Sequence, residues 1–174
     1  MLRLFVGISL PPELKLRLSL LASGLPQAKW VDPGNYHVTL RFIGEVDEGV
    51  ASDIDAALLR VRTPRFSLTL AGVGHFGLRS LYAGVERSEP LFRLQDKIES
   101  ALVRAGLPPE GRKFSPHVSL ARLKGPANAR LTQYLAQHAL FRAGPFAVTQ
   151  FQLVASYPTK SGSIYEDQAE YELV

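Results

Sequence analysis

Two histidines stand in matching short patterns, one in each half of the chain. Residues 37–40 read His-Val-Thr-Leu, and residues 117–120 read His-Val-Ser-Leu. A single histidine two positions before a hydroxyl residue is common in strands and is more often structural than functional. Two such patterns, 80 positions apart in a chain of 174 residues, are much harder to explain by structure alone. The pair therefore indicates chemistry that needs two imidazoles.

The first pattern lies in a segment rich in β-branched and aromatic residues, which is typical of a strand. Side chains alternate between the two faces of a strand, so residues two apart share a face. This alternation predicts that His37, Thr39 and Arg41 share one face. It also predicts that Val38 and Phe42 point into a core on the other side.

The second pattern repeats the arrangement with His117 and Ser119 on one face and Val118 behind them. Strict alternation places Arg122 on the face opposite His117. To reach the face of His117, Arg122 would need a bend in the strand or would have to reach round from the end of the strand. If the two strands meet at the centre of a cleft, two imidazoles and two hydroxyls face each other.

Two imidazoles and two hydroxyls form a competent site for cleaving a phosphodiester. Histidine titrates near neutral pH, so one ring can be neutral while the other is protonated. The neutral ring removes a proton from attacking water, and the protonated ring gives one to the leaving oxygen. The hydroxyls donate hydrogen bonds to the phosphate oxygens. This scheme requires no metal and no cofactor, and no carboxylate sits at metal-ligand spacing beside either histidine.

Nearly the whole chain resembles the two-histidine phosphoesterase superfamily, whose signature is a pair of His-x-Thr/Ser-x motifs. Within it, the sequence is similar to the RNA 2′,3′-cyclic phosphodiesterases, also called 2′-5′ RNA ligases. The segments that carry this resemblance are 3–8, 35–44, 115–122 and 153–165. Ser119 departs from the commoner threonine but keeps the hydroxyl, so the departure does not threaten the site.

The resemblance implies a role for each residue of the site. It implies that His37 is the acid that protonates the leaving 3′-oxygen and that His117 is the base that activates water. It assigns phosphate binding to Arg122, beside the hydroxyls of Thr39 and Ser119. The two motifs are nearly symmetric, so the residues alone leave open which ring is the acid.

The resemblance also implies the substrate and the product. The expected reaction opens a terminal 2′,3′-cyclic phosphate of RNA, such as that of a tRNA fragment, and leaves a 2′-phosphate. Reversal would join this end to a 5′-hydroxyl through a 2′-5′ linkage without ATP. Two alternatives stay open: a phosphodiesterase of the same superfamily that acts on 2′-5′ oligoadenylates or small cyclic nucleotides, and a non-catalytic RNA-binding module.

Basic and aromatic residues near the motifs are candidates for contact with RNA. They are Tyr36 and Phe114, which precede the two histidines, together with Arg41 and Lys124. For both aromatic residues, packing in the core is the stronger expectation. For Lys124, a solvated loop charge is a slightly stronger alternative than a basic rim.

Hydrophobic periodicity and turn residues predict strands alternating with helices. The expected helices cover 13–23, 50–61, 91–105 and 131–139. The expected strands cover 4–10, 30–31, 36–43, 66–70, 81–85, 117–123, 146–155 and 165–174, with a glycine-rich turn at 72–77. These elements predict an α+β fold with two pseudo-symmetric lobes around a central cleft. Each lobe would be a mainly antiparallel sheet with outer helices, and residues 1–174 would form a single bilobal domain.

The composition is that of an ordinary globular protein, with 46% hydrophobic and 21% charged residues. The net charge of +4 permits an anionic partner such as RNA without demanding one. The absence of cysteine excludes disulfides and cysteine-bound zinc. We find no signal peptide and no apolar run near the ~20 residues that span a bilayer. We therefore expect a cytoplasmic monomer with no membrane partner.

Overall fold

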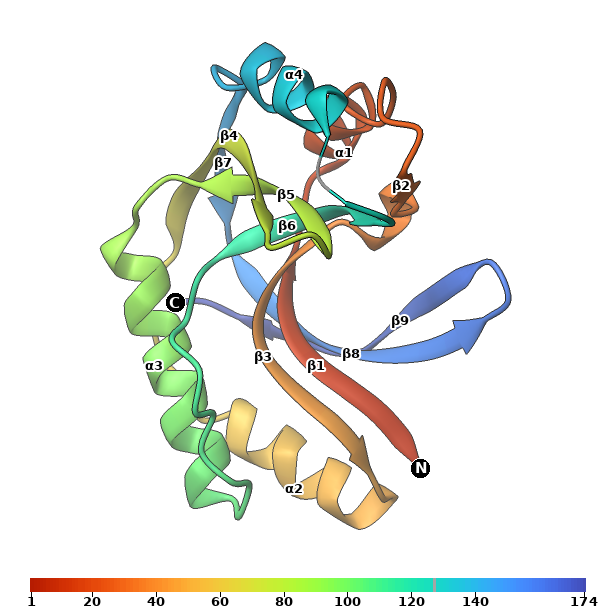
Figure 1. Cartoon of the computed structure of the whole chain (residues 1–174). Helices are drawn as coiled ribbons and strands as arrows, with labels where there is room; N and C mark the ends of the chain where they lie inside the picture. Colours follow the sequence, from red (N-terminus) through yellow and green to blue (C-terminus); the bar gives the residue numbers. More distant parts are fainter. Residues whose placement is uncertain (127) are drawn as a thin grey trace.

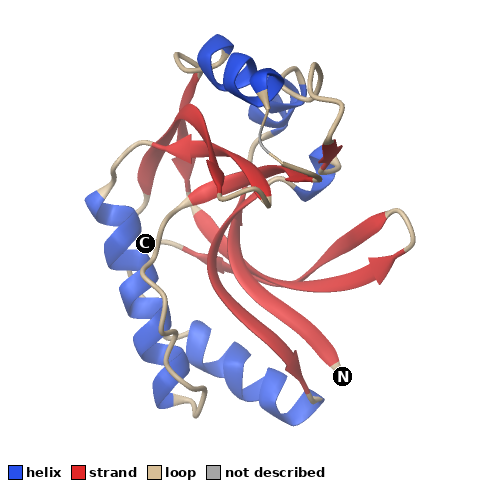
Figure 2. Ribbon diagram, viewed as in Figure 1, coloured by secondary structure: helices blue, strands red, loops and turns tan. Residues whose placement is uncertain are grey.

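The computed structural model describes residues 1–126 and 128–174, and these form an α+β fold. Figure 1 labels the elements, and Figure 2 distinguishes helices from strands. In chain order the elements are β1 (Leu2–Ser9), α1 (Pro12–Ser19), β2 (Ala28–Trp30), the 3-10 turn η1 (Pro33–Asn35), β3 (His37–Val46), α2 (Glu48–Leu58), β4 (Phe66–Phe76), β5 (Ser80–Val85), α3 (Glu89–Arg104), β6 (His117–Leu123), α4 (Ala129–Gln137), β7 (Arg142–Val148), β8 (Gln150–Thr159) and β9 (Gly162–Glu172).

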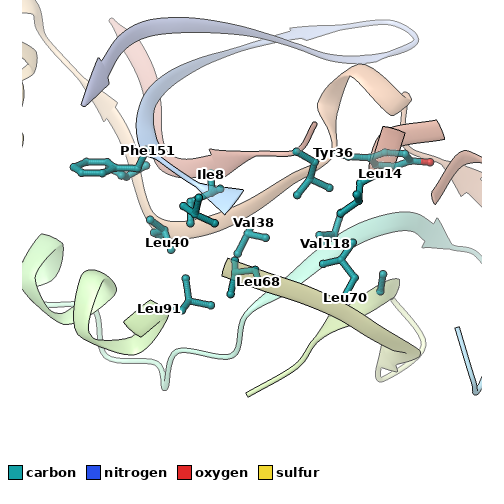
Figure 3. Packing of buried hydrophobic residues seen from close by; sticks show 14 of the residues in the cluster. Ile8, Leu14, Tyr36, Val38, Leu40, Leu68, Leu70, Leu91, Val118 and Phe151 are labelled. Carbon is teal, nitrogen blue, oxygen red and sulfur yellow. The ribbon is translucent and has the colours of Figure 1, made fainter. Parts of the chain in front are cut away.

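The predicted α+β class is confirmed, and the two lobes join in one sheet. Over the described residues this sheet has nine strands in the order β7-β4-β5-β6-β3-β1-β8-β9, with β2 added beside β6. All of its pairings are antiparallel. The two motif strands, β3 and β6, are neighbours at the middle of this order. Their register pairs Val38 with Val118, and both side chains are buried in the core that Figure 3 shows.

The four helices of the described residues lie outside the sheet (Figure 2). The most regular is α3, where Ser88 caps the first turn by accepting a hydrogen bond from the Leu91 backbone N–H. Its buried residues recur at helical spacing, as the sequence predicts: Leu91, Leu94, Ile98, Ala101 and Leu102. No helix in the described part of the chain is both long and apolar enough to cross a membrane.

Three strand predictions need correction. Most of the expected glycine-rich turn at 72–77 is the second half of β4, which pairs with β5 as far as Phe76 opposite Ser80, and the turn itself begins at Gly77. The expected stop at Gly44 is also wrong, because β3 continues through a left-handed glycine to Val46. The single strand expected over 146–155 is two strands, β7 and β8, which lie at different places in the sheet.

The two halves of the chain exchange strands. The β4 and β5 strands belong to the first half of the sequence but pair with β7 and β6 of the second half, while β8 and β9 belong to the second half and β8 pairs with β1 of the first half. Each half of the sheet therefore contains two strands from the other half of the chain. Neither half of the sequence can complete its own sheet.

This exchange predicts that the chain unfolds as one cooperative unit. Denaturant unfolding followed by far-UV circular dichroism and by the fluorescence of Trp30, the one tryptophan of the chain, should give coincident transitions. A fragment that ends after β5 should not fold by itself. Two separated transitions, or a folded half-chain fragment, would contradict a single domain.

Candidate functional site

The two motif histidines are the first residues of adjacent antiparallel strands. His37 begins β3 and His117 begins β6. Because Val38 is paired with Val118, the antiparallel register places His37 across from Ser119 and Thr39 across from His117. The two imidazoles and the two hydroxyls therefore flank this one cross-strand pair, on two adjacent strands.

Both imidazoles are anchored to the backbone in the same way. The Nδ1 atom of His37 lies 3.1 Å from the carbonyl oxygen of Asn35, and that of His117 lies 2.7 Å from the carbonyl oxygen of Ser115. A carbonyl only accepts, so each Nδ1 carries the hydrogen and donates it. The Nε2 atom of each ring is left to accept a proton when the ring is neutral and to donate one when it is charged.

A β-bulge interrupts each motif strand at the same position. In β3, Thr39 pairs with Gly7 and Arg41 pairs with Val6, so Leu40 is skipped. In β6, Ser119 pairs with Tyr82 and Ala121 pairs with Leu81, so Leu120 is skipped. A bulge adds one residue to one strand and shifts the faces of the residues that follow it. Alternation counted from the histidines therefore fails after the fourth residue of each motif.

The bulge in β3 overturns two sequence expectations. Arg41 does not share the face of His37: its side chain is only 7% exposed, and its Nε atom donates to a Glu99 carboxylate oxygen at 3.0 Å. The same guanidinium donates to the carbonyl oxygens of Phe42 and Pro108. Phe42, expected in the core, is 43% exposed, and the Arg3 guanidinium carbon lies 5.6 Å from the centre of its ring.

The bulge in β6 settles the position of Arg122. Leu120 and Ala121 are consecutive buried residues, and Arg122 is exposed, as Ser119 is. The strand therefore bends locally, and Arg122 returns to the face of His117 and Ser119. It lines a cavity of about 630 Å³ to which Asn35 and Tyr165 also contribute.

Two aromatic rings enclose His37. The ring centroids of Phe5 and Tyr165 lie 5.8 and 5.6 Å from that of His37, both edge-on, and His37 is 9% exposed. Burial lowers the pKa of His37 below its ordinary value of 6.5, because a charged ring there loses its hydration. The hydrogen bond to Asn35 opposes this shift. Nearby Lys15 lowers the pKa further, and Asp167 raises it.

Two other aromatic rings border His117, and one of them is exposed to solvent. The ring centroids of Phe76 and Tyr82 lie 4.8 and 5.4 Å from that of His117, and these two rings stack on each other at 4.5 Å. Phe76 is 39% exposed. The glycine opposite Tyr82 makes room for its ring, because a Cβ atom on Gly74 would lie 2.5 Å from the Tyr82 hydroxyl oxygen. Sequence analysis missed Phe76, Tyr82 and Tyr165, since none of them stands near a motif in the chain.

Three candidate RNA contacts lie away from the two histidines or are buried. Tyr36 is fully buried in the core, as Figure 3 shows, which removes it as an RNA contact. Phe114 is partly buried and packs edge-on against Phe92 with 5.3 Å between ring centroids. Lys124 is exposed after the end of β6 and lines a second cavity together with Gln27 and Lys29, of which Lys29 also lines the cavity of Arg122.

Comparison with known proteins identifies a family and several relatives. Residues 14–158 match the family described as the 2′-5′ RNA ligase superfamily. A protein of Aeropyrum pernix named RNA 2′,3′-cyclic phosphodiesterase is 38% identical over 158 residues, which cover 87% of this chain and 89% of that protein. A protein of the same name from Methanothermobacter thermautotrophicus is 32% identical, and the match covers 98% of both chains.

Solved structures show the same fold. The structure of Escherichia coli LigT complexed with 3′-AMP superposes with a TM-score of 0.84 at 27% identity, covering 99% of this chain and 98% of that one. The structure of TT0787 from Thermus thermophilus gives a TM-score of 0.78 at 27% identity, with 98% and 97% covered. These matches span the full sheet, including both motif strands.

The enclosure of His37 predicts that its ring titrates below pH 6.5 in the free protein. The NMR chemical shifts of the ring, assigned by comparison with His37→Ala, should give this midpoint. Because the unfolded chain holds this proton to higher pH, the contribution of neutral His37 to stability is present above pH 6.5 and is lost as the pH falls through the folded-state pKa. A midpoint above 6.5 would contradict desolvation as the dominant effect.

Proposed function

The chain belongs to the 2′-5′ RNA ligase superfamily, and we propose that it hydrolyses the 2′,3′-cyclic phosphate at the 3′ end of RNA. The observation that carries this proposal is the paired arrangement of His37 and His117. Both rings are fixed through Nδ1, which leaves Nε2 of each ring for proton transfer, and the two motifs flank one cross-strand pair of adjacent strands. The names of the relatives supply the substrate class.

In the proposed reaction, water attacks phosphorus in line with the bond to the 3′-oxygen. His117 takes the proton from the attacking water through Nε2, and His37 gives a proton to the departing 3′-oxygen. The bond from phosphorus to the 3′-oxygen breaks, and the phosphate stays on the 2′-oxygen. After the reaction His117 is protonated and His37 is neutral, and proton exchange with solvent restores both starting states. Protein side chains supply both proton transfers, so the scheme names no metal and no cofactor.

The neighbouring side chains would stabilise the charge on the phosphate. Thr39 and Ser119 would donate hydrogen bonds to its non-bridging oxygens. Arg122, which the bulge returns to the same face, would add a charge-assisted contact. A bound phosphate also raises the pKa of a nearby histidine. The substrate itself would thus favour the charged form of His37 that the acid role needs.

The same geometry supports ligation, with the 5′-hydroxyl of a second RNA in place of the attacking water. His117 would take the proton of that hydroxyl, and His37 would protonate the leaving 3′-oxygen. The phosphate would then join the 2′-oxygen to the 5′-oxygen in a 2′-5′ linkage, without ATP. Two other functions compete with hydrolysis of RNA ends: action on 2′-5′ oligoadenylates or small cyclic nucleotides, and binding of RNA without catalysis. Product analysis on an RNA oligomer with a 2′,3′-cyclic phosphate, beside a panel of these smaller substrates, separates the three.

Removal of either histidine should slow hydrolysis by roughly 10²–10⁴-fold, the range for a positioned acid or base. His37→Ala and His117→Ala should both show this loss in kcat, and the double variant should be little slower than the slower single variant because the pair acts as a unit. His138→Ala, at the C-terminal end of α4, is the matched control and should keep the wild-type rate. A folded motif variant with a near-normal rate would remove that histidine from the mechanism.

A substrate with sulfur in place of the bridging 3′-oxygen should separate the acid from the base. A thiolate leaves without being protonated, so loss of the acid matters little on this substrate. Hydrolysis by His37→Ala should therefore be largely restored, while His117→Ala should stay slow. The opposite pattern would exchange the two roles. Equal failure of both variants would mean that each ring also positions the phosphate.

A further inference from the structure

A cavity of about 630 Å³ lies next to the site, and its lining includes neighbours of His37 but not His37 itself. Asn35 and Tyr165 line it, and both also contact His37: the Asn35 carbonyl accepts from Nδ1, and the Tyr165 ring packs edge-on against the imidazole. The β8–β9 hairpin, which projects from the sheet in Figure 1, forms the other wall. The Asn35 side chain donates to the carbonyl oxygen of Ser163 and thereby ties this wall to the η1 turn.

Three cations from three different strands line the cavity. They are Arg3 of β1, Lys29 of β2 and Arg122 of β6, and all three are exposed. None of the three forms an ion pair within the part of the chain that the structure describes. The one carboxylate of the lining belongs to Asp32, and it accepts a hydrogen bond from the Gly34 backbone N–H at 2.8 Å.

The register of β2 with β6 brings two of these positive charges together and destabilises the free protein. Lys29 is the direct cross-strand partner of Arg122, so two positive side chains stand opposite each other. Like charges in directly opposite positions of an antiparallel pair destabilise it. An anion bound between the two side chains would convert this repulsion into two attractions. The pairing of Lys29 with Arg122 is therefore an observation that points to a ligand, independent of the cavity itself.

We propose that this cavity binds the phosphodiester immediately 5′ of the terminal nucleotide through Lys29 and Arg3, with Arg122 placed between this phosphodiester and the cyclic phosphate so that its guanidinium contacts both. This inference rests on the proposed function. When the cyclic phosphate lies at the 3′ end of an RNA, every other phosphate of that strand lies upstream of it. A groove that starts at the site and carries free cations thus fits the upstream backbone. The partly buried Trp30 in the same lining offers a ring on which an upstream base can stack.

The consequence is a preference for RNA oligomers over cyclic mononucleotides. The test compares kcat/KM on three substrates: adenosine 2′,3′-cyclic phosphate, the dinucleotide ApA with a 2′,3′-cyclic phosphate, and the same dinucleotide with a neutral methylphosphonate linkage. The wild-type protein should prefer the normal dinucleotide over both others. Lys29→Gln and Arg3→Gln should each lose roughly tenfold or more on the normal dinucleotide, which corresponds to one charge-assisted hydrogen bond.

The decisive result is whether the loss of kcat/KM in Lys29→Gln depends on the negative charge of the linkage. Lys29→Gln should leave kcat/KM on the mononucleotide unchanged, and on the methylphosphonate dinucleotide it should cause no further loss. Arg104→Gln is the matched control, because Arg104 is an exposed cation of α3 that lines a different cavity, and it should behave as the wild type on all three substrates. An equal loss on every substrate, or a loss that persists on the methylphosphonate, would overturn the inference.

Binding measurements keep this inference separate from the proposed function. If the wild-type protein hydrolysed none of the three substrates, the proposed function would be wrong, yet the cavity could still be tested. The affinity for the dinucleotide ApA with a 2′-phosphate should be higher than that for its methylphosphonate analogue, and Lys29→Gln should abolish this difference. Equal affinities for the two dinucleotides in the wild-type protein would overturn the inference whatever the activity.

Discussion

The site depends on the pairing of Val38 with Val118. These two side chains are fully buried at the junction of β3 and β6, where the two halves of the sheet meet. Burial of both fixes which way the neighbouring residues point, since a slip of one residue would turn the valines to solvent and the histidines into the core. Burial of the two valines thereby sets the position of the face that carries both histidines.

The exchange of strands between the two halves of the chain stabilises this junction from both sides. The β3 strand pairs with β1, which in turn pairs with β8 from the second half of the chain, and β6 pairs directly with β5 from the first half. A movement that separated β3 from β6 would have to pull against strands that cross from one half of the chain to the other. Two motifs distant in sequence are thus presented by one rigid sheet, as acid–base catalysis requires.

Sequence patterns predict the parts of this protein that follow a simple period. The apolar stripe of α3, the start of β6 at His117 and the opposed faces of Val38 and Thr39 all follow from alternation or helical spacing. What the patterns miss is the bulge, because the bulged residues Leu40 and Leu120 are apolar and fit an ordinary strand. The aromatic rings beside the histidines are missed for another reason, since they come from strands that only the tertiary fold brings to the site.

The bulges also explain how two similar motifs have come to face different surroundings. Both turn the fifth residue of the motif inward and the sixth outward, but the residues at these positions differ. In the first motif Arg41 is turned inward to Glu99 and the apolar Phe42 outward; in the second, small Ala121 is turned inward and Arg122 outward. The same backbone irregularity therefore turns an apolar ring to solvent in one motif and a cation in the other. Because His37 is enclosed by two rings while His117 is bordered by an exposed one, the nearly symmetric pair of motifs forms an asymmetric site.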